Sequence, residues 1–317
     1  MLDKIYLSRY KFTLLPEYEL HLPQYLGSTL RGGFGSVFRK IVCCYRDKIC
    51  NECLLKSKCI YSYVFETSPP ENSEKLRNIE SIPRPYIIDP PAFDSTAVYS
   101  PERPLRFYLN LIGKAVEYFP YFIVAFQELG KVGIGRKKEK FIIQEVEIQD
   151  IATGNLEQIY FPNGTVLNKR YIFSLEDALK QVNTKDYTAI KIDFLSPVRL
   201  KAGSYQHTPV FRHFFGSLLR RLSSLSYFHC NTELKISYAN ILTQAEHIEL
   251  FDNHTHWKDW ERYSSRQQTK MKFGGLMGST GYEGNLTPFM PYLNFGQWIH
   301  VGKNATFGLG KYEILSL

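Results

Sequence analysis

The sequence has no long apolar run. Its longest candidate, Tyr121–Phe126, is far shorter than the ~20 residues that a membrane-spanning helix needs. The first residues, Met1–Tyr6, also lack the basic and apolar regions of a secretory signal. We therefore expect a cytoplasmic protein rather than a membrane or secreted one.

Cysteine is scarce outside one short segment. Five of the six cysteines lie between Cys43 and Cys59. A small secreted scaffold spreads paired cysteines along its chain, so this clustering indicates metal-binding or free thiols instead of a disulfide framework. The spacing predicts a structural site for zinc or an iron–sulfur cluster, with Cys44 as an alternative to the first ligand. The four predicted ligands are Cys43, Cys50, Cys53 and Cys59.

Acidic residues are fewer than basic ones. The chain has 31 Asp and Glu against 39 Lys and Arg, a formal net charge of +8 over 317 residues. Because Lys and Arg release condensed counterions when they bind phosphates, this excess favours a polyanionic partner. No basic amphipathic helix of the interfacial kind is evident, so we expect no membrane partner. The length suffices for two modest domains.

The two halves of the chain share an order of predicted elements. Apolar residues alternate with polar ones at Tyr10–Leu14 and again at Ile190–Phe194, as in half-buried strands. Helical spacing of apolar residues follows in each half, over Gln24–Val42 and Phe211–Leu225. Each half then closes with a glycine-rich basic segment that runs into a further strand. These segments are 131–138, before strand 141–148, and 300–311, before strand 312–315.

This repeated order predicts an α+β fold of two tandem ferredoxin-like (RRM-like) domains with glycine-rich loops, the first carrying a cysteine-rich insertion. We expect an N-terminal domain at 1–150, a linker at 151–186 and a C-terminal domain at 187–317. Within the linker, Asn163-Gly164 predicts a hairpin turn, and Ser174-Leu-Glu-Asp177 predicts a capped short helix. Six prolines between Pro83 and Pro104 predict an irregular covering segment.

Several short motifs occur in an order that resembles one protein family. They are Leu30-Arg-Gly-Gly-Phe-Gly35, Cys50-Asn-Glu-Cys53, Val64-Phe-Glu66, Pro83-Arg-Pro-Tyr86, Lys131-Val-Gly-Ile-Gly-Arg136, Leu219-Arg-Arg-Leu222, Trp260–Gln267, Gly274-Gly-Leu-Met-Gly278, His300-Val-Gly-Lys303 and Phe307-Gly-Leu-Gly310. Together they resemble the CRISPR repeat-RNA endoribonucleases, a branch of the repeat-associated RNA-binding (RAMP) superfamily. Each motif alone is weak, and the resemblance depends on their number and order over nearly the whole chain.

The resemblance implies two ferredoxin-like domains that bind CRISPR repeat RNA and cut it once without a metal ion. It also implies that the processed crRNA passes to subunits of a CRISPR effector complex, and DNA is not an expected partner. Some members carry a general-base histidine on the first helix of the N-terminal domain. The corresponding helix here, Gln24–Val42, contains no histidine.

The implied reaction uses the 2′-hydroxyl of the RNA as its nucleophile and leaves a 2′,3′-cyclic phosphate. It needs a proton carrier, for which histidine is suited by its unperturbed pKa of about 6.5, and cations that stabilise phosphoryl charge. His300 is the first candidate, since it begins the second glycine-rich segment and lies three residues before the basic Lys303. His213, on the polar side of the predicted helix, is the second. His21 and His207 are further candidates.

Basic and amide side chains near these motifs are the predicted RNA contacts, because Arg binds phosphates bidentately and Gln reads base edges. They are Arg31, Arg136, Lys137, Lys138, Arg220, Arg262, Arg266, Gln267 and Lys311. Glycine in the two loops lets backbone N–H groups approach phosphates closely.

Three other functions compete with RNA cleavage. A non-cleaving RNA-binding RAMP subunit would use the same loops and basic surface. A metal-dependent nuclease would require ligands, for which His254, His256 and Asp259 are the only suggestion. A redox enzyme would use Cys50 and Cys53, but the parallel βαβ pattern of a thioredoxin-like site is missing.

Overall fold

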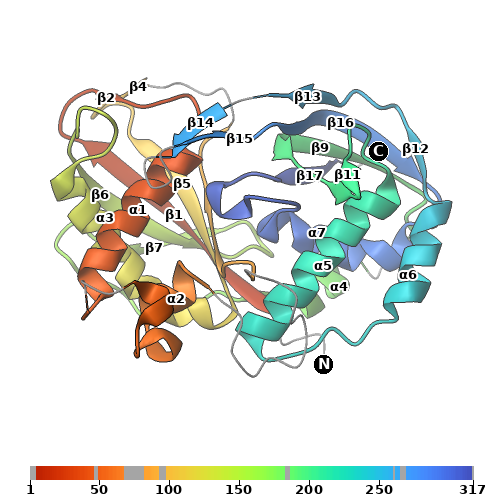
Figure 1. Cartoon of the computed structure of the whole chain (residues 1–317), viewed down its shortest axis with the longest axis horizontal. Helices are drawn as coiled ribbons and strands as arrows, with labels where there is room; N and C mark the ends of the chain where they lie inside the picture. Colours follow the sequence, from red (N-terminus) through yellow and green to blue (C-terminus); the bar gives the residue numbers. More distant parts are fainter. Residues whose placement is uncertain are drawn as a thin grey trace. The chain divides into compact units, whose positions relative to one another are not determined.

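The computed structural model describes residues 5–45, 49–67, 82–92, 98–182, 186–259, 261–264 and 269–315 (Figure 1). Two compact units make up the chain. The N-terminal unit consists of Lys4–Phe173 and Ser224–Thr232, and the C-terminal unit of Met1–Asp3, Ser174–Ser223 and Glu233–Leu317. Within the described residues, no helix is both long and apolar enough to cross a membrane.

An antiparallel sheet with strand order β3-β5-β1-β6-β7 forms the centre of the N-terminal unit. Its first four strands and the two helices between them follow the chain order β-α-β-β-α-β, which is the ferredoxin-like arrangement with β7 added at one edge. The elements are β1 (Tyr6–Pro16), α1 (Gly27–Val42), β3 (Tyr86–Asp89), β5 (Leu105–Ile112), α3 (Phe119–Val132), β6 (Phe141–Gln149) and β7 (Leu156–Tyr160).

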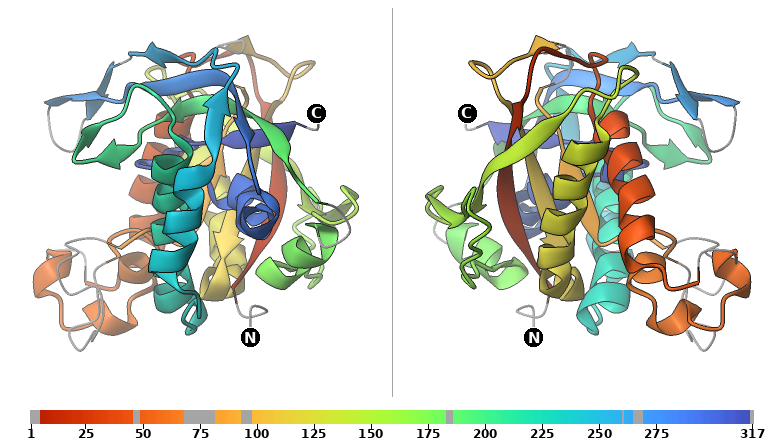
Figure 2. Two further views of the ribbon diagram at one scale, coloured as in Figure 1. Left: turned by 90° about the vertical axis from the view of Figure 1, so that its right-hand side faces the viewer. Right: turned by 90° about the vertical axis from the view of Figure 1, so that its left-hand side faces the viewer.

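Helices α1 and α3 lie side by side against one face of this sheet (Figure 2). Phe34 of α1 stacks on Phe122 of α3, with ring centroids 4.7 Å apart. The glycines of α1 lower its intrinsic helix preference, but they allow this close packing. A Cβ atom on Gly33 would lie 3.0 Å from the Leu129 side chain of α3. The helix is therefore stabilised by its tertiary contacts rather than by its composition.

The segment between Pro83 and Pro104 is not the irregular covering that its prolines predict. It contains the edge strand β3, all four residues of which are buried, and the short strand β4 (Val98–Tyr99). Prolines flank β3 without interrupting it, so the strand keeps its hydrogen bonds to β5. Strand β4 pairs with β2 (Leu20–His21).

Short elements fill the rest of the N-terminal unit. Two 3₁₀ turns (Cys50–Glu52 and Lys56–Lys58) and helix α2 (Ile60–Val64) contain or border the clustered cysteines, and a third 3₁₀ turn (Gly113–Tyr118) leads into α3.

The C-terminal unit repeats the same chain order around a second antiparallel sheet, β12-β16-β9-β17. The elements are β9 (Ala189–Val198), α5 (Phe211–Cys230), β12 (Glu249–Phe251), β16 (Gly275–Glu283), α7 (Met290–Ile299) and β17 (Tyr312–Leu315). The last turns of α5, Ser224–Cys230, belong to the N-terminal unit. Two ferredoxin-like units in tandem confirm the predicted fold class.

Strand β8 (Phe173–Ser174) pairs with β1 of the N-terminal sheet. The C-terminal unit has further elements besides its sheet and two long helices. They are α4 (Leu175–Val182), the hairpin β10 (Lys201–Ala202) and β11 (Ser204–Tyr205), α6 (Tyr238–Gln244), β13 (His256–Lys258), the hairpin β14 (Glu261–Ser264) and β15 (Thr269–Lys272), and 3₁₀ turns at Ala245–His247, Thr287–Phe289 and Ala305–Phe307. Strand β13 pairs with β16.

Aromatic residues of α5 form the core of the C-terminal unit. Phe214 packs edge-on against Phe194 of β9 and against Tyr312 of β17, at centroid distances of 5.5 and 5.2 Å. Gly296 of α7 lies so close to Leu218 of α5 that a Cβ atom would be 2.7 Å from it. The apolar stripe seen in the sequence therefore faces the sheet.

The region 151–186, expected to be a linker, is divided between the two units. Strand β7 extends the N-terminal sheet by pairing with β6, whereas α4 packs on α7. The predicted turn at Asn163-Gly164 is confirmed, with Gly164 at a φ of 86°. The predicted cap is also confirmed: Ser174 N donates to Asp177 Oδ2 at 2.9 Å, and Asp177 N donates to Ser174 Oγ at 3.1 Å.

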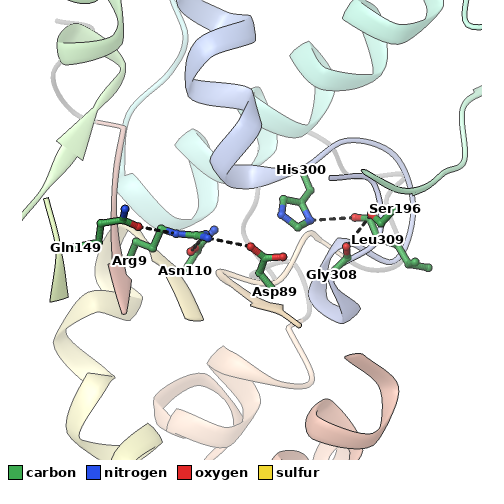
Figure 3. A network of polar contacts seen from close by, with 8 residues as sticks. All are labelled: Arg9, Asp89, Asn110, Gln149, Ser196, His300, Gly308 and Leu309. Carbon is green, nitrogen blue, oxygen red and sulfur yellow. Dashed lines mark hydrogen bonds and ion pairs between the residues drawn. The ribbon is translucent and has the colours of Figure 1, made fainter. Parts of the chain in front are cut away.

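A buried charged cluster crosses the N-terminal sheet (Figure 3). The Arg9 guanidinium of β1 donates to Asp89 Oδ2 at 3.0 Å, Asn110 Oδ1 at 2.8 Å and Gln149 Oε1 at 3.0 Å. The Arg9 and Asp89 side chains are only 6% and 2% exposed. Arg9 also lies 3.8 Å from the Tyr108 ring centroid. These hydrogen bonds satisfy a charge that would otherwise be costly to bury.

Candidate RNA-processing site

The first glycine-rich loop is a tight turn between α3 and β6. Helix α3 ends at Gly133, whose φ of 85° favours glycine. Ile134 and Glu139 then exchange backbone hydrogen bonds of 2.9 and 3.1 Å across the turn. The predicted RNA contacts Arg136, Lys137 and Lys138 are all exposed in this loop. The backbone thus displays three positive charges on a narrow turn.

His21 lies against this loop, at the end of β2. Its backbone N donates to Glu139 Oε2 at 3.1 Å, and its Nδ1 lies 3.4 Å from Glu139 Oε1. The His21 side chain is 46% exposed and the Glu139 side chain only 16%. A half-exposed histidine is therefore oriented by a largely buried carboxylate, which is how proteins commonly fix the tautomer of a working imidazole.

Neighbouring groups complete this cluster. A Cβ atom on Gly135 would lie 3.5 Å from His21 O and 3.7 Å from Glu139 Oε2, so a side chain at this position would be in van der Waals contact with both residues. The more exposed Glu19 carboxylate lies 3.6 Å from His21 Nε2. An imidazole, carboxylates and adjacent basic side chains are the groups needed to move a proton beside a phosphate.

The second glycine-rich loop is pinned to the end of β9. Ser196 Oγ donates to Gly308 O at 2.9 Å and accepts from Lys311 N at 2.9 Å. Gly310 N donates to Pro197 O at 3.1 Å. A Cβ atom on Gly302 would lie 2.5 Å from Arg199 O. The glycines are required here by the close approach of the loop to the strand.

His300, the first catalytic candidate from the sequence, is 0% exposed. Its Nδ1 lies 3.2 Å from Leu309 O, so the imidazole contributes to closing the second loop (Figure 3). A group that exchanges protons with RNA must reach it, and this burial argues against such a role. Lys303, by contrast, is exposed on the same loop.

The predicted residues on helices have different surroundings. Arg31 of α1 packs its guanidinium 4.0 Å from the Phe65 ring centroid, inside the N-terminal unit. His213 of α5 is half-buried, and its Nδ1 has no hydrogen-bond partner within the part of the chain that the structure describes. Arg220 of α5 is exposed, as a phosphate contact requires. Lys311 is half-buried, and its backbone N is held by Ser196.

The remaining predicted RNA contacts fall in the 260–272 segment. Arg266 and Gln267 lie outside the described residues, and only the backbone of Arg262, in β14, is described. Their roles stay predictions from the sequence.

The four predicted metal ligands all lie between α1 and α2. Cys50 and Cys53 flank one 3₁₀ turn, with Cys53 N donating to Cys50 O at 3.4 Å, and Cys59 precedes α2. Burial raises the pKa of the Cys50 thiol, and the nearby Cys43 and Cys59 thiols raise this pKa further. Among the described residues, no group of three or more His, Cys, Asp or Glu side chains is placed to hold a metal ion.

Two of the residues suggested as ligands for a metal-dependent nuclease, His254 and Asp259, have other partners. His254 Nε2 lies 2.6 Å from Asp252 Oδ1, and Asp259 Oδ1 accepts a 2.8 Å hydrogen bond from Trp257. The suggested ligands are thus engaged separately.

Two functional features were not found from the sequence. Glu139 is the partner of His21, yet 118 residues separate them, and no local pattern links the two. His229, near the end of α5, is 3% exposed and lies 2.7 Å from Pro83 O and 3.2 Å from Tyr63 Oη. It lies four residues beyond the helix predicted over Phe211–Leu225, so the sequence gave no signal of these contacts.

Two family models and one curated relative match the chain. A model described as CRISPR-associated endoribonuclease Cas6 matches residues 192–312, and one described as an N-terminal domain matches residues 5–171. An uncharacterized protein of Archaeoglobus fulgidus is 28% identical over 319 residues, which is 98% of each chain.

Solved structures share the fold at low sequence identity. A Cas6 product complex has a TM-score of 0.58 at 15% identity, over 98% of this chain and 100% of that one. Thermus thermophilus Cas6 has a TM-score of 0.56 at 14% identity, over 98% of this chain and 99% of that one.

Two ferredoxin-like units in tandem, each with a basic glycine-rich loop after its second long helix, form the fold that the Cas6 structures share. The chain thus matches the CRISPR-associated Cas6 endoribonuclease family over residues 192–312 and shares the fold of Cas6 structures over nearly its whole length. These matches support a CRISPR-associated endoribonuclease.

Proposed function

We propose that this chain binds CRISPR repeat RNA and cuts the precursor crRNA without a metal ion. The observation that carries the proposal is the half-exposed His21, oriented by Glu139 beside the basic first loop. RNA brings its own nucleophile, the 2′-hydroxyl. The protein has to remove one proton, stabilise charge on the phosphoryl oxygens and allow the leaving oxygen to be protonated.

In this mechanism His21 accepts the proton of the 2′-hydroxyl through Nε2. The 2′-oxygen bonds to phosphorus while the bond from phosphorus to the 5′-oxygen breaks, and that oxygen takes up a proton from solvent water. The products are a 2′,3′-cyclic phosphate and a 5′-hydroxyl. Glu139 favours the tautomer that carries its proton on Nδ1, and the RNA takes the place of the exposed Glu19 carboxylate at Nε2. Arg136, Lys137 and Lys138 neutralise developing charge.

The candidates taken from the sequence enter the same scheme differently. Lys303 and His213 stay predictions, Lys303 as a cation for phosphate and His213 as an alternative proton carrier. We favour His21 over His300 for the proton transfer because a fully buried imidazole does not reach a bound phosphate.

The test is cleavage of the host's repeat RNA in excess EDTA. We expect wild type to cut, and an RNA with a 2′-deoxy substitution at the cut to resist. His21→Ala should lower the cleavage rate by about 100-fold or more, the usual contribution of a positioned acid or base, with unchanged RNA affinity. Glu139→Gln should give a smaller loss, because the amide still contacts the ring.

His254→Ala is the matched control. This histidine is also exposed and paired with a carboxylate, Asp252, but it belongs to the C-terminal unit and contacts no residue of the proposed site in the described structure, so cleavage should be unchanged. Full activity of His21→Ala would contradict the assignment and direct the search to His300 and His213. Tight binding without any cleavage by wild type would instead favour a non-cleaving RAMP subunit.

We also infer that the processed crRNA passes to subunits of a CRISPR effector complex. Pull-down of tagged protein from the host, with and without ribonuclease treatment, tests this. Co-purification of effector subunits that is lost after RNA digestion is the expected result, and their absence from untreated samples would contradict it.

A further inference from the structure

A tyrosine on a short hairpin of the C-terminal unit, Tyr205, lies beside two basic side chains. Strands β10 and β11 form this hairpin around Gly203, whose φ is 74°. Gln206 N closes the hairpin by donating to Leu200 O at 3.1 Å. Tyr205 is 40% exposed, an unusually open position for a large aromatic side chain on an ordered hairpin. The backbone thus fixes a ring that water can reach.

Two basic side chains from different segments contact this ring. The Arg199 guanidinium lies 4.6 Å from the Tyr205 ring centroid, and its Nε donates to Gly274 O at 3.0 Å, which holds it in place. Lys303 Nζ lies 5.7 Å from the same centroid and 3.4 Å from Tyr205 Oη. Lys303 comes from the second glycine-rich loop, so the hairpin and the loop meet at Tyr205.

A second aromatic pair adjoins this cluster. The rings of His207 and Trp257 lie 4.5 Å apart, at an angle of 38°. Gly274 connects the two groups, because its carbonyl accepts from Arg199 while a Cβ atom on it would lie 2.9 Å from Trp257 Nε1. Trp257 Nε1 in turn donates to Asp259 at 2.8 Å. Aromatic and basic groups therefore alternate over one small surface.

The chemistry of this surface suits an unpaired nucleotide. Proteins bind single-stranded RNA by stacking bases on aromatic or guanidinium planes and by placing cations on the neighbouring phosphates. A paired A-form helix offers no exposed base faces, so a duplex would not use the ring in this way. If the cluster only stabilised the hairpin, one contact between a cation and the exposed Tyr205 ring would suffice for that purpose. The second cation at the same ring would then add little to stability.

We propose that Tyr205, Arg199 and Lys303 form a subsite for an unpaired nucleotide of the repeat RNA. The base stacks on the exposed part of the Tyr205 ring, and Lys303 holds the adjacent phosphate. This inference rests on the proposed function in that it takes repeat RNA as the ligand. It adds that the bound RNA keeps at least one single-stranded position beside its contacts with the C-terminal unit.

The test uses non-cleavable repeat RNAs, 2′-deoxy at the cut, that carry 2-aminopurine at one unpaired position at a time. We expect wild type to quench one position upon binding, and Tyr205→Ala to lose that quench and bind about tenfold more weakly. Tyr205→Phe should keep both within about twofold, because stacking needs the ring and not the hydroxyl. Thermal melting checks that each variant is folded.

Tyr121→Ala is the matched control, since this tyrosine is 39% exposed on α3 of the other unit. It should leave affinity and quench unchanged. Wild-type affinity in Tyr205→Ala would overturn the subsite even if the RNA is cut normally. An equal loss on a fully paired hairpin would overturn it too, since that result indicates a groove contact. If wild-type protein quenches the 2-aminopurine through Tyr205 but never cuts the repeat RNA, the subsite stands and only the cleavage proposal is refuted.

Discussion

Two arginines that are neighbours in the chain, Arg220 and Arg221, have opposite environments. On α5 one step of about 100° along the helix separates their side chains. Arg220 is exposed, whereas Arg221 donates from Nε to Ile299 O at 2.8 Å, at the end of α7. Burial lowers the pKa of Arg221 to about 10, so it keeps its charge at neutral pH. A cation at the last carbonyls of a helix is favourable, which gives Arg221 a structural role.

At the same scale, the ion pair of Arg9 and Asp89 should be essential for stability. Asp89→Ala leaves a buried guanidinium without its carboxylate, and removing one partner of such a pair costs about 3–5 kcal/mol. We expect urea unfolding of this variant to show a loss of that size. Asp89→Asn should lose less, because the amide oxygen still accepts the hydrogen bond.

An exposed pair provides the comparison. Glu128 and Lys131 are paired one helical turn apart on α3, with side chains 41% and 73% exposed. Because water screens such pairs, Glu128→Ala should leave the unfolding midpoint almost unchanged. Equal losses of unfolding free energy in Asp89→Ala and Glu128→Ala would show that the buried ion pair contributes no more to stability than the exposed one.

At the scale of whole elements, α1 and β3 both form although residues in or near them disfavour regular structure. Glycines in α1 and prolines near β3 both argue against regular structure, yet both elements form. In α1 the missing side chain lets Leu129 of α3 approach, and around β3 the prolines stand outside the hydrogen-bonded ladder. Propensity in each case is outweighed by packing that only the other elements supply.

The segment between α1 and α2 carries the metal prediction. Its four spaced thiols, Cys43, Cys50, Cys53 and Cys59, stay a predicted structural site. We expect elemental analysis of protein purified without chelator to find about one zinc, or iron from a cluster, per chain, because four thiolates make a closed site. Cys53→Ser should abolish that content and lower the melting temperature.

Cys230→Ser provides the control for that experiment, since this thiol lies in α5 and burial raises its pKa to about 11. Metal content should not change in this variant. If wild-type protein contains no metal and melts at the same temperature as Cys53→Ser, the cysteines do not form a metal site.

For the molecule as a whole, the net charge of +8 predicts RNA binding that weakens with salt. If the first loop contacts phosphates, replacing Arg136, Lys137 and Lys138 by glutamine removes up to three of those contacts. The plot of log affinity against log salt should then become shallower by about 2, at roughly 0.7 per contact. Filter binding over a salt series gives the slope.

A second triple variant separates local contact from overall charge. Lys40, Lys56 and Lys58 lie in α1 and in the cysteine segment, so replacing them by glutamine removes the same charge elsewhere. Its slope should stay close to that of wild type. Equal changes in both variants would mean that net charge, and not the loop, governs binding.

The sequence by itself determined what depends on near neighbours. The strand and helix order, the cap of α4 by Ser174 and Asp177, and the turn at Asn163-Gly164 all follow from periodicity or from groups a few residues apart. The same local patterns located both glycine-rich loops and their charges. They could not rank the eight histidines, because reactivity depends on exposure and on partners.

Our proposed ranking rests on contacts that only the tertiary structure provides. His21 and Glu139 meet because β2 lies against the turn that follows α3, and no spacing in the chain encodes that contact. His300, which has the more suggestive sequence context, is enclosed where its loop folds back to Leu309. Proton transfer to RNA requires both reach and orientation. Those two properties arise from contacts between residues far apart in the chain, and so they appear only once it is folded.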